Sequence, residues 1–186
     1  MIGVRAADPE RDAERIAEIY AVYVRDAIVT FEEEPPTSAE MAARMAAVLL
    51  RTPWLVAEAD GQIVGYAYAS AHRERPGYRW SVDISAYVDE QARGRGVGKT
   101  LYAELVGVIR RQGFVNVYAG IALPNPASVA LHESIGMRRL CVYEKVGWKL
   151  GRWIDVAWFA MQLNAPVDDG TRPPEPITWP QLRDGA

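Results

Sequence analysis

The chain has 186 residues, which is enough for one domain that buries roughly 70% of its unfolded surface without disulfides or a metal. Hydrophobic residues make up 49% and charged residues 24%, as in globular proteins. The net charge of −3 gives no basis for binding nucleic acid or an anionic membrane, and the single cysteine, Cys141, excludes an internal disulfide. We find no run of ~18 apolar residues, and Met1–Arg5 lacks the apolar core of a signal peptide, so we expect a cytoplasmic protein.

The first fifty residues predict one strand followed by two helices. Ile2–Ala6 is short and apolar, as in a strand. Asp8 is a helix N-cap residue before proline, and apolar residues at helical spacing predict a helix over Pro9–Asp26. Thr37 and Glu40 have the spacing of a capping box, which predicts the start of a second helix.

Three strands are predicted next. Trp54–Ala59 and Gln62–Ser70 flank Asp60-Gly61, a pair that favours a tight hairpin turn. Trp80–Val88 alternates with a period of two. This alternation puts Asp83 on one face together with Ser81, Ser85 and Tyr87.

A glycine-rich loop, Arg93–Lys99, follows this strand and leads into a helix predicted over Thr100–Gln112. Three glycines let the backbone pass close to an anion, and the N–H groups of a helix N-terminus point at such an anion. Two arginines and a lysine add positive charge. The loop has neither the spacing of a P-loop nor that of the dinucleotide fingerprint. We therefore predict a pyrophosphate site of another kind.

The remaining residues predict a strand, a helix, a hairpin and a tail, at Val115–Ile121, Asn125–Gly136, Arg138–Val146 with Arg152–Leu163, and Asn164 onward. The hairpin is expected to turn through Gly147–Gly151, and the proline-rich tail is expected to lie on the surface or stay mobile. The order β-α-α-β-β-β-α-β-α-β-β predicts an α/β domain around one mixed sheet.

The element order and the glycine loop, which fits R-x-x-G-x-G at Arg93, Gly96 and Gly98, resemble the GCN5-related N-acetyltransferases. Several segments further resemble the phosphinothricin and methionine sulfoximine/sulfone acetyltransferases: Thr30-Phe31, Trp54–Glu58, Tyr78–Asp83, Ser85–Val88, Leu123–Val129, Leu131–Glu133 and Gly151–Val156. The likeness runs from Val4 to Leu163. It implies the acetyltransferase fold, with a domain over residues 1–163 and a separate tail over 164–186.

The resemblance implies acetyl-CoA as co-substrate and assigns residues to it by position. The backbone of Ala86, Tyr87 and Val88 would pair with the pantetheine arm, and the Val88 N–H would stabilise the oxyanion. Asn125 would bind further along the cofactor. The pyrophosphate would lie on Arg93, Gly94, Arg95, Gly96, Val97, Gly98 and Lys99.

Acetyl transfer requires the acceptor amine to lose a proton, because amines are largely protonated at neutral pH. Asp83 is the candidate base, directly or through a water; the family carries glutamate at this position. His132, where the phosphinothricin-type enzymes also have histidine, would return a proton to the thiolate, with Tyr102 as a lesser candidate. Cys141 matches no nucleophile position, so we expect direct transfer. No cluster has metal-ligand spacing, and we expect no metal.

The expected acceptor pocket contains Phe31, Arg73, Arg75, Tyr78 and Ser85. Two arginines suit a carboxylate or phosphinate because each guanidinium can donate two parallel hydrogen bonds. The tryptophans of the final hairpin, at 148, 153 and 158, are expected in the core or in the interface of a homodimer.

The resemblance thus implies an N-acetyltransferase for the α-amino group of a small amino-acid analogue. Two alternatives stay open. The acceptor could instead be a polyamine, an aminoglycoside or a peptide N-terminus, or the chain could be a non-catalytic acyl-CoA-binding module.

Overall fold

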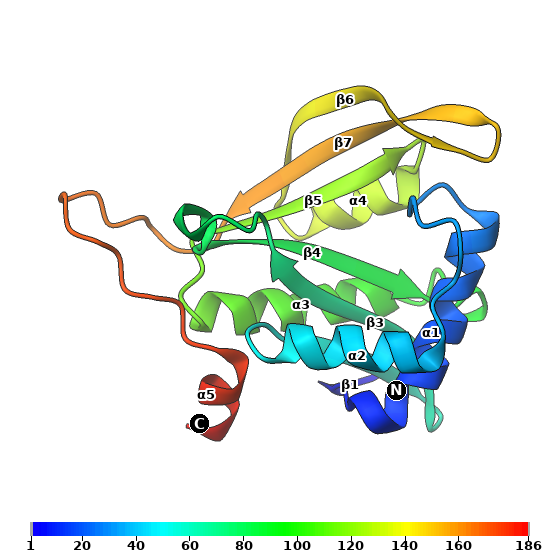
Figure 1. Ribbon diagram of the computed structural model, residues 1–186, viewed down its shortest axis with the longest axis horizontal. Helices are drawn as coiled ribbons and strands as arrows, with labels where there is room; N and C mark the ends of the chain where they lie inside the picture. The colour runs from blue at the N-terminus through cyan, green and yellow to red at the C-terminus, as the bar shows by residue number, and fades with distance from the viewer. Residues whose placement is uncertain (1, 186) are drawn as a thin grey trace.

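The computed structural model describes residues 2–185 and forms one seven-stranded mixed sheet flanked by helices (Figure 1). The strands are β1 (Gly3–Ala6), β2 (Trp54–Ala59), β3 (Gln62–Ala71), β4 (Ser81–Val88), β5 (Asn116–Leu123), β6 (Arg138–Lys149) and β7 (Arg152–Gln162). The helices are α1 (Pro9–Asp26), α2 (Ser38–Leu49), α3 (Val97–Arg111), α4 (Pro126–Ser134) and α5 (Trp179–Asp184), with short 3-10 turns η1 (Pro76–Tyr78) and η2 (Glu90–Ala92). The predicted α/β class and the element order through β7 are confirmed.

Local signals explain where the first elements begin and turn. The Asp8 side chain accepts hydrogen bonds from two N–H groups in the first turn of α1. The capping box of Thr37 and Glu40 is present at the start of α2. Asp60 and Gly61 take φ values of 52° and 78°, the left-handed conformations that a tight turn between β2 and β3 needs.

The strand order is β1-β2-β3-β4-β5-β7-β6, and every neighbouring pair is antiparallel except β4 and β5. These two central strands are parallel and pair over only three positions, from Ser81 opposite Asn116 to Asp83 opposite Tyr118. The rest of β4, from Ile84 onward, has no partner on this side. The sheet is therefore open along its middle.

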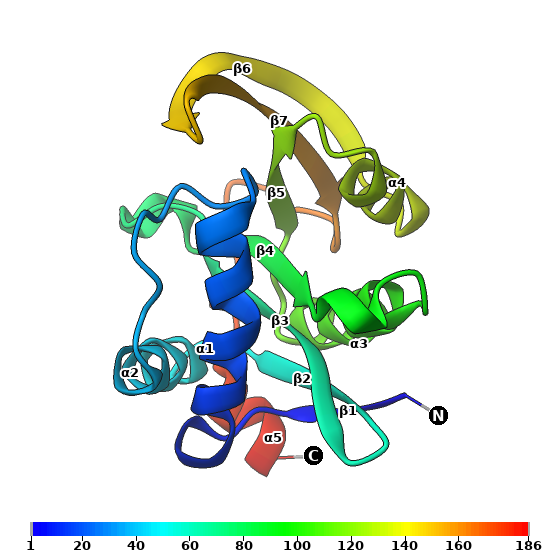
Figure 2. The ribbon, with the colours of Figure 1, turned by 90° about the vertical axis from the view of Figure 1, so that its right-hand side faces the viewer.

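The helices cover the two faces of the sheet as separate layers. Figure 2 shows α1 and α2 on one face and α3 and α4 on the other. Val82 and Ile84 of β4 lie in the core beneath α3, whereas Tyr87 packs with the core beneath α1 and α2. The predicted alternation of β4 is thus confirmed: Asp83 and Ser85 share the α1 face with Tyr87.

Two predicted boundaries were wrong. Helix α3 begins at Val97, three residues before the predicted start, because Gly96 adopts φ 83° and is already the residue that caps the helix. The last hairpin turns at Leu150 and Gly151, with φ values of 49° and 75°, so β6 extends to Lys149 through the predicted loop.

The tryptophans of this hairpin differ from one another. Trp148 and Trp153 pair across β6 and β7 with ring centroids 5.4 Å apart, and both are more than half exposed, so the core prediction is wrong for them. Trp158 is partly buried.

The segment after β7 packs on the domain. The Trp80 indole N–H donates to the Pro174 carbonyl (2.7 Å), and the Gln112 side chain donates to the Ile177 carbonyl (2.8 Å). The chain then forms α5, which was not predicted. Among residues 2–185, every helix is too short or too polar to span a bilayer.

Candidate active site

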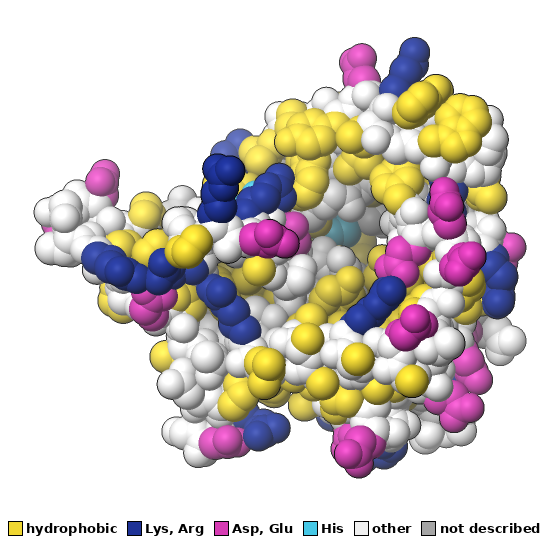
Figure 3. Space-filling view, in the orientation of Figure 1, with side chains coloured by type: hydrophobic (Ala, Val, Ile, Leu, Met, Phe, Trp, Pro, Cys, Tyr) yellow, Lys and Arg dark blue, Asp and Glu magenta, His cyan; other side chains and the backbone are white. Residues whose placement is uncertain are grey.

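The opening between β4 and β5 contains a cavity of about 670 Å³ that reaches both faces of the sheet. Figure 3 shows the molecule hollowed at this place, between the β6–β7 hairpin and helices α1 and α2. From the α1 face the lining includes Tyr23, Ile28, Val29 and Ser85, and from the other face Tyr102, Ser128, Leu131 and His132. Two reactants can therefore meet in this opening from opposite faces.

The glycine loop forms one end of this cavity. Gly94 and Gly96 have φ values of 73° and 83°, and a Cβ on either would meet only open space, so these glycines serve the backbone conformation. A Cβ at Gly98 would lie 3.0 Å from the Leu131 side chain, so this glycine allows α3 to approach α4. Of the predicted loop residues, Arg93, Gly94, Gly96, Val97, Gly98 and Lys99 line the cavity, whereas Arg95 does not.

The register of β4 decides which backbone groups face the opening. The Asp89 N–H donates to the Val64 carbonyl, so odd-numbered residues of β4 direct their backbone groups to β3. The backbone groups of Ala86 and Val88 therefore point into the opening, but those of Tyr87 do not. Tyr87 therefore contributes its side chain to the cavity and not its backbone groups.

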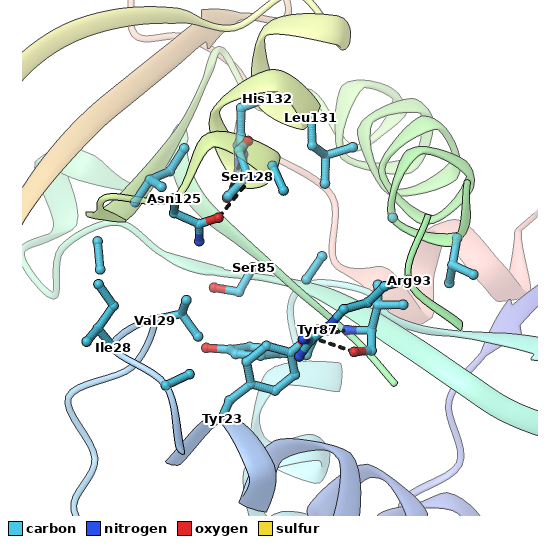
Figure 4. Close-up of a pocket in the computed structure, with 18 of the residues that line it drawn as sticks. Tyr23, Ile28, Val29, Ser85, Tyr87, Arg93, Asn125, Ser128, Leu131 and His132 are labelled. Atoms are coloured by element: carbon cyan, nitrogen blue, oxygen red, sulfur yellow. Dashed lines mark hydrogen bonds between the residues drawn. The ribbon is translucent and has the colours of Figure 1, made fainter. Parts of the chain in front are cut away.

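Tyr23 of α1 covers the end of this free strand edge (Figure 4). Its hydroxyl donates to the Val88 carbonyl (2.5 Å) and accepts from the Val88 N–H (3.2 Å). The guanidinium of Arg93 lies over the Tyr23 ring, 5.1 Å from the centroid. The N–H that we predicted as oxyanion donor thus has a partner within the protein.

On the α4 side, His132 and Tyr102 form a buried pair. His132 Nδ1 lies 2.7 Å from the Ser128 carbonyl, and because a carbonyl only accepts, Nδ1 carries the proton. The neutral ring then accepts the Tyr102 hydroxyl at Nε2 (3.1 Å). Burial lowers the pKa of His132 and raises that of Tyr102, so both stay uncharged near neutral pH. Both line the cavity.

Asp83 lies just outside the cavity, on the α1 face. Its carboxylate is 2.6 Å from Nδ1 of His72, which follows β3 directly. Burial raises the pKa of Asp83, an effect that the His72 hydrogen bond and the charge of Arg73 partly oppose. Ser85, the next residue on the same face, lines the cavity.

A second cavity of about 400 Å³ adjoins the first. The two share Val29, Gly120 and Ala122. The second is lined mainly by apolar and aromatic groups, with Phe31, Tyr143, Val146, Val156 and Trp158 completing its wall. None of these is charged, so the chamber suits an uncharged side chain.

The structure brings together only part of the predicted acceptor pocket. Phe31 lines the second cavity and Ser85 the first, and the Arg73 guanidinium lies over Trp158, 5.9 Å from the ring centroid. Arg73, Arg75 and Tyr78 themselves line neither cavity.

Asn125 lies at the start of α4 and lines the first cavity. Its side-chain oxygen accepts the Ser128 N–H (3.1 Å), so it serves as the N-cap.

Within the described part of the chain, residues 2–185, no group of histidines, cysteines and carboxylates has the geometry of a metal site.

Two contributors to this site were not predicted, Tyr23 and His72. Tyr23 is one of the residues at helical spacing that predict the helix over Pro9–Asp26, and this pattern gives no sign of a role in a site. His72 precedes Arg73 in a segment that gave no sign of its conformation. A histidine close to a predicted strand end was the available signal.

Residues 5–158 match the family description "Acetyltransferase (GNAT) domain". The chain therefore belongs to the GNAT acetyltransferase family, and it is an acetyl-CoA-dependent N-acetyltransferase.

The relatives within this family include phosphinothricin and methionine sulfoximine/sulfone acetyltransferases. The chain is 41% identical over 156 residues to the phosphinothricin N-acetyltransferase of Alcaligenes faecalis, covering 83% of this chain and 79% of that protein. It is 35% identical over 162 residues to the L-methionine sulfoximine/L-methionine sulfone acetyltransferase of Salmonella typhimurium, covering 87% and 94%. The crystal structure of a GNAT superfamily phosphinothricin acetyltransferase from Sinorhizobium meliloti, in complex with acetyl-CoA, matches with TM-score 0.86 and 38% identity, covering 92% and 96%.

Proposed function

We propose that this enzyme acetylates the free α-amino group of a small amino-acid analogue of the phosphinothricin, methionine sulfoximine or methionine sulfone type. The observation that carries the proposal is the pair of joined cavities: one ends at the glycine loop, and the other is an uncharged chamber on the acceptor side. Two groups of relatives, the phosphinothricin and the methionine sulfoximine/sulfone acetyltransferases, support this class of acceptor by their names.

Acetyl-CoA would enter along the first cavity. Its pyrophosphate would lie on the N–H groups of Gly94–Lys99 at the start of α3, with Arg93 and Lys99 supplying positive charge. The pantetheine arm would pair with the free edge of β4 at Ala86, and at Val88 where Tyr23 yields its hydrogen bonds. Asn125 would remain close to the arm.

The acceptor would bind from the α1 face, with an uncharged sulfone or sulfoximine side chain in the second cavity beside Phe31. The phosphinate of phosphinothricin is anionic, so it would have to lie on the Arg73 side of that cavity. Arg73, above Trp158, would attract the acceptor's carboxylate. Charge argues against a polyamine or aminoglycoside acceptor, because Asp26 is the one carboxylate among the described residues that line the two cavities. A polycation would need more acidic groups than this.

The chemistry requires two proton transfers. Asp83 would take a proton from the ammonium through a water, and the free amine would attack the acetyl carbonyl to form the amide bond as the C–S bond breaks. The amine nitrogen then loses its second proton to solvent. On the opposite face, the Tyr102 hydroxyl, which donates its one proton to Nε2 of His132 in the structure, would release that bond and turn its O–H toward the departing sulfur. The thiolate takes up a proton and leaves as free CoA.

A homodimer is part of the proposal. The β6–β7 hairpin exposes a group of large apolar side chains: Leu140, Tyr143, Val146, Trp148, Leu150 and Trp153. Figure 3 shows hydrophobic side chains gathered over the tip of this hairpin, at the top right. Exposed apolar patches of this kind are typical of interfaces, and a second copy of the chain is the occupant we propose.

The experiment that tests the function is a thiol-release assay with acetyl-CoA and a panel of amines. We expect turnover with phosphinothricin, methionine sulfoximine and methionine sulfone, and little with polyamines or aminoglycosides. Preference for the polycations would contradict the acceptor class. Tight CoA binding without thiol release for any amine would indicate a binding module.

A further inference from the structure

Side chains from β3, β5 and β7 lie together with Asp83 of β4 on the α1 face of the sheet. Asp83 lies opposite Ser70 of β3 and opposite Tyr118 of β5. His72 is two residues beyond Ser70, so it is the diagonal neighbour of Asp83 on the same face. Trp158 of β7 pairs with Gly120, two residues after Tyr118, and therefore belongs to this face as well.

The aromatic neighbours fix the ring of His72. It stacks on Tyr118 with centroids 4.4 Å apart and an interplanar angle of 24°. The edge of Trp158 and that of Tyr78 approach at 6.1 and 6.2 Å. The ring is thus held from three directions, and its Nδ1 is left facing the Asp83 carboxylate at 2.6 Å.

The carboxylate of Asp83 depends on this contact. An ionised carboxylate only accepts hydrogen bonds, so Nδ1–H of His72 donates to Oδ1. Among the described residues, Oδ2 of Asp83 accepts no hydrogen bond. One oxygen is therefore fixed, and the other is free to receive a proton.

The place of Asp83 in the sheet explains why the orientation of its carboxylate matters. Asp83 and Tyr118 form the last pair before β4 and β5 separate. Gly120, the next residue of β5 on this face, lines both cavities and has no side chain to block the way. The free oxygen therefore lies one residue from the junction where acetyl donor and acceptor would meet.

We propose that His72 is a positioning residue for Asp83, holding its carboxylate through Nδ1–H so that the second oxygen can accept the proton of the acceptor amine. This inference rests on the proposed role of Asp83 as base. The inference also bears on the aspartate that this chain has where the family carries glutamate. The hydrogen bond from His72 would hold the shorter Asp83 side chain in one orientation. His72 itself neither touches the acceptor nor takes the proton.

Two variants separate positioning from the other roles a histidine can have. His72→Asn keeps an N–H donor close to the place of Nδ1 but loses the imidazole ring. His72→Phe keeps a ring to stack on Tyr118 but has no donor. A positioning role predicts that kcat stays within about threefold of wild type in the Asn variant and falls at least tenfold in the Phe variant. The KM for acetyl-CoA should be unchanged in both.

The pH profile of kcat supplies a second readout. In His72→Phe the hydrogen bond that opposes the raised pKa of Asp83 is lost, so the acid limb should move to higher pH; in His72→Asn it should stay in place. The other charged or ionisable groups that face the pair are Arg73, Tyr68, Tyr78 and Tyr118, and both variants retain them.

The measurements use the acceptor that wild type prefers, so an error in the proposed acceptor class leaves them valid. Equal loss of kcat in both variants would mean that His72 takes the proton itself and would overturn the positioning role. Wild-type kcat in His72→Phe would also overturn it. Independently of activity, proton NMR should show a downfield His72 Nδ1–H resonance that disappears in Asp83→Asn; its absence from wild type would contradict the contact.

Discussion

The two histidines of this chain lie on opposite faces of one sheet and have opposite surroundings. His132 is buried, donates to a carbonyl and accepts a hydroxyl, so both of its partners are uncharged. His72 is less buried and faces a carboxylate. Burial lowers the pKa of His132 and keeps it uncharged, whereas His72 has a carboxylate oxygen 2.6 Å from its Nδ1. The same residue type thus serves different proton chemistry on the two faces.

This contrast suggests that the two proton-handling steps of acetyl transfer take place on different faces of the sheet. In the proposed mechanism, Asp83, held by His72, deprotonates the amine on the α1 face. Tyr102 and His132 would stabilise the leaving thiolate on the α3 and α4 face. The opening between β4 and β5 joins the two, and four substitutions test how far they are independent.

Asp83→Asn should have the largest effect. A carboxamide cannot accept the proton, so we expect kcat to fall roughly 100-fold or more, within the usual range for a lost general base. The KM for acetyl-CoA should change less than about twofold, since Asp83 lies outside the cavity proposed for the cofactor. Steady-state kinetics with each substrate varied measures both. Asp169→Asn, in the exposed tail, is the control.

The wild-type pH profile belongs to the same test. Burial raises the pKa of Asp83, and the base acts in its ionised form. Activity should therefore be present above that pKa and be lost as the pH falls through it, at a higher pH than an ordinary aspartate would give. An acid limb that is unchanged in Asp83→Asn would show that another group is responsible.

Tyr102→Phe should come next, because it removes the hydroxyl proposed to hydrogen-bond the departing sulfur. We expect kcat to fall about tenfold to 100-fold with the KM for the acceptor unchanged. Tyr66→Phe removes another buried tyrosine hydroxyl, from the α1 face, and serves as the matched control. Equal losses in the two variants would point to a general effect on folding, which thermal melts would reveal.

Gly120→Ala places a methyl group where the two cavities join. Its Cβ would lie 3.3 Å from a methyl carbon of Val156 and 3.6 Å from the Trp158 ring, so the neighbours must shift slightly. We expect the KM for the acceptor to rise about fivefold and that for acetyl-CoA to stay constant. An equal rise for both substrates would contradict entry from opposite faces.

Tyr23→Phe should have the smallest effect. Without its hydroxyl, the Val88 N–H and carbonyl are free to pair with the cofactor. One hydrogen bond contributes about 0.5–1.5 kcal/mol net, so the dissociation constant for CoA should fall about twofold to tenfold in calorimetry. Weaker binding would instead mean that the hydroxyl itself binds the cofactor.

Much of the fold could be predicted because its signals are local. The caps at Asp8 and Thr37 and the turn at Asp60-Gly61 each act within a few residues, and the structure has all three. The start of α3 was missed because the backbone conformation of Gly96, not its residue type, decides where a helix begins.

The site was less predictable, because its geometry comes from pairs distant in sequence. The resemblance pointed to Asp83, Tyr102 and His132, but not to the faces on which they lie. The separation of β4 from β5 depends on how these strands pack, and no local pattern records it. Likewise, His72 meets Asp83 only through the register of β3 on β4.

The C-terminal segment has a consequence for handling the protein. Gln112 is almost fully buried, and its amide N–H groups are divided between the Arg51 and Ile177 carbonyls. A chain shortened after Leu163 would lose Ile177 and uncover this amide, together with the indole of Trp80 at the root of the strand that carries Asp83. A chain that ends at Leu163 would therefore give a less stable enzyme, so residues 164–185 should be kept for crystallisation and assays alike.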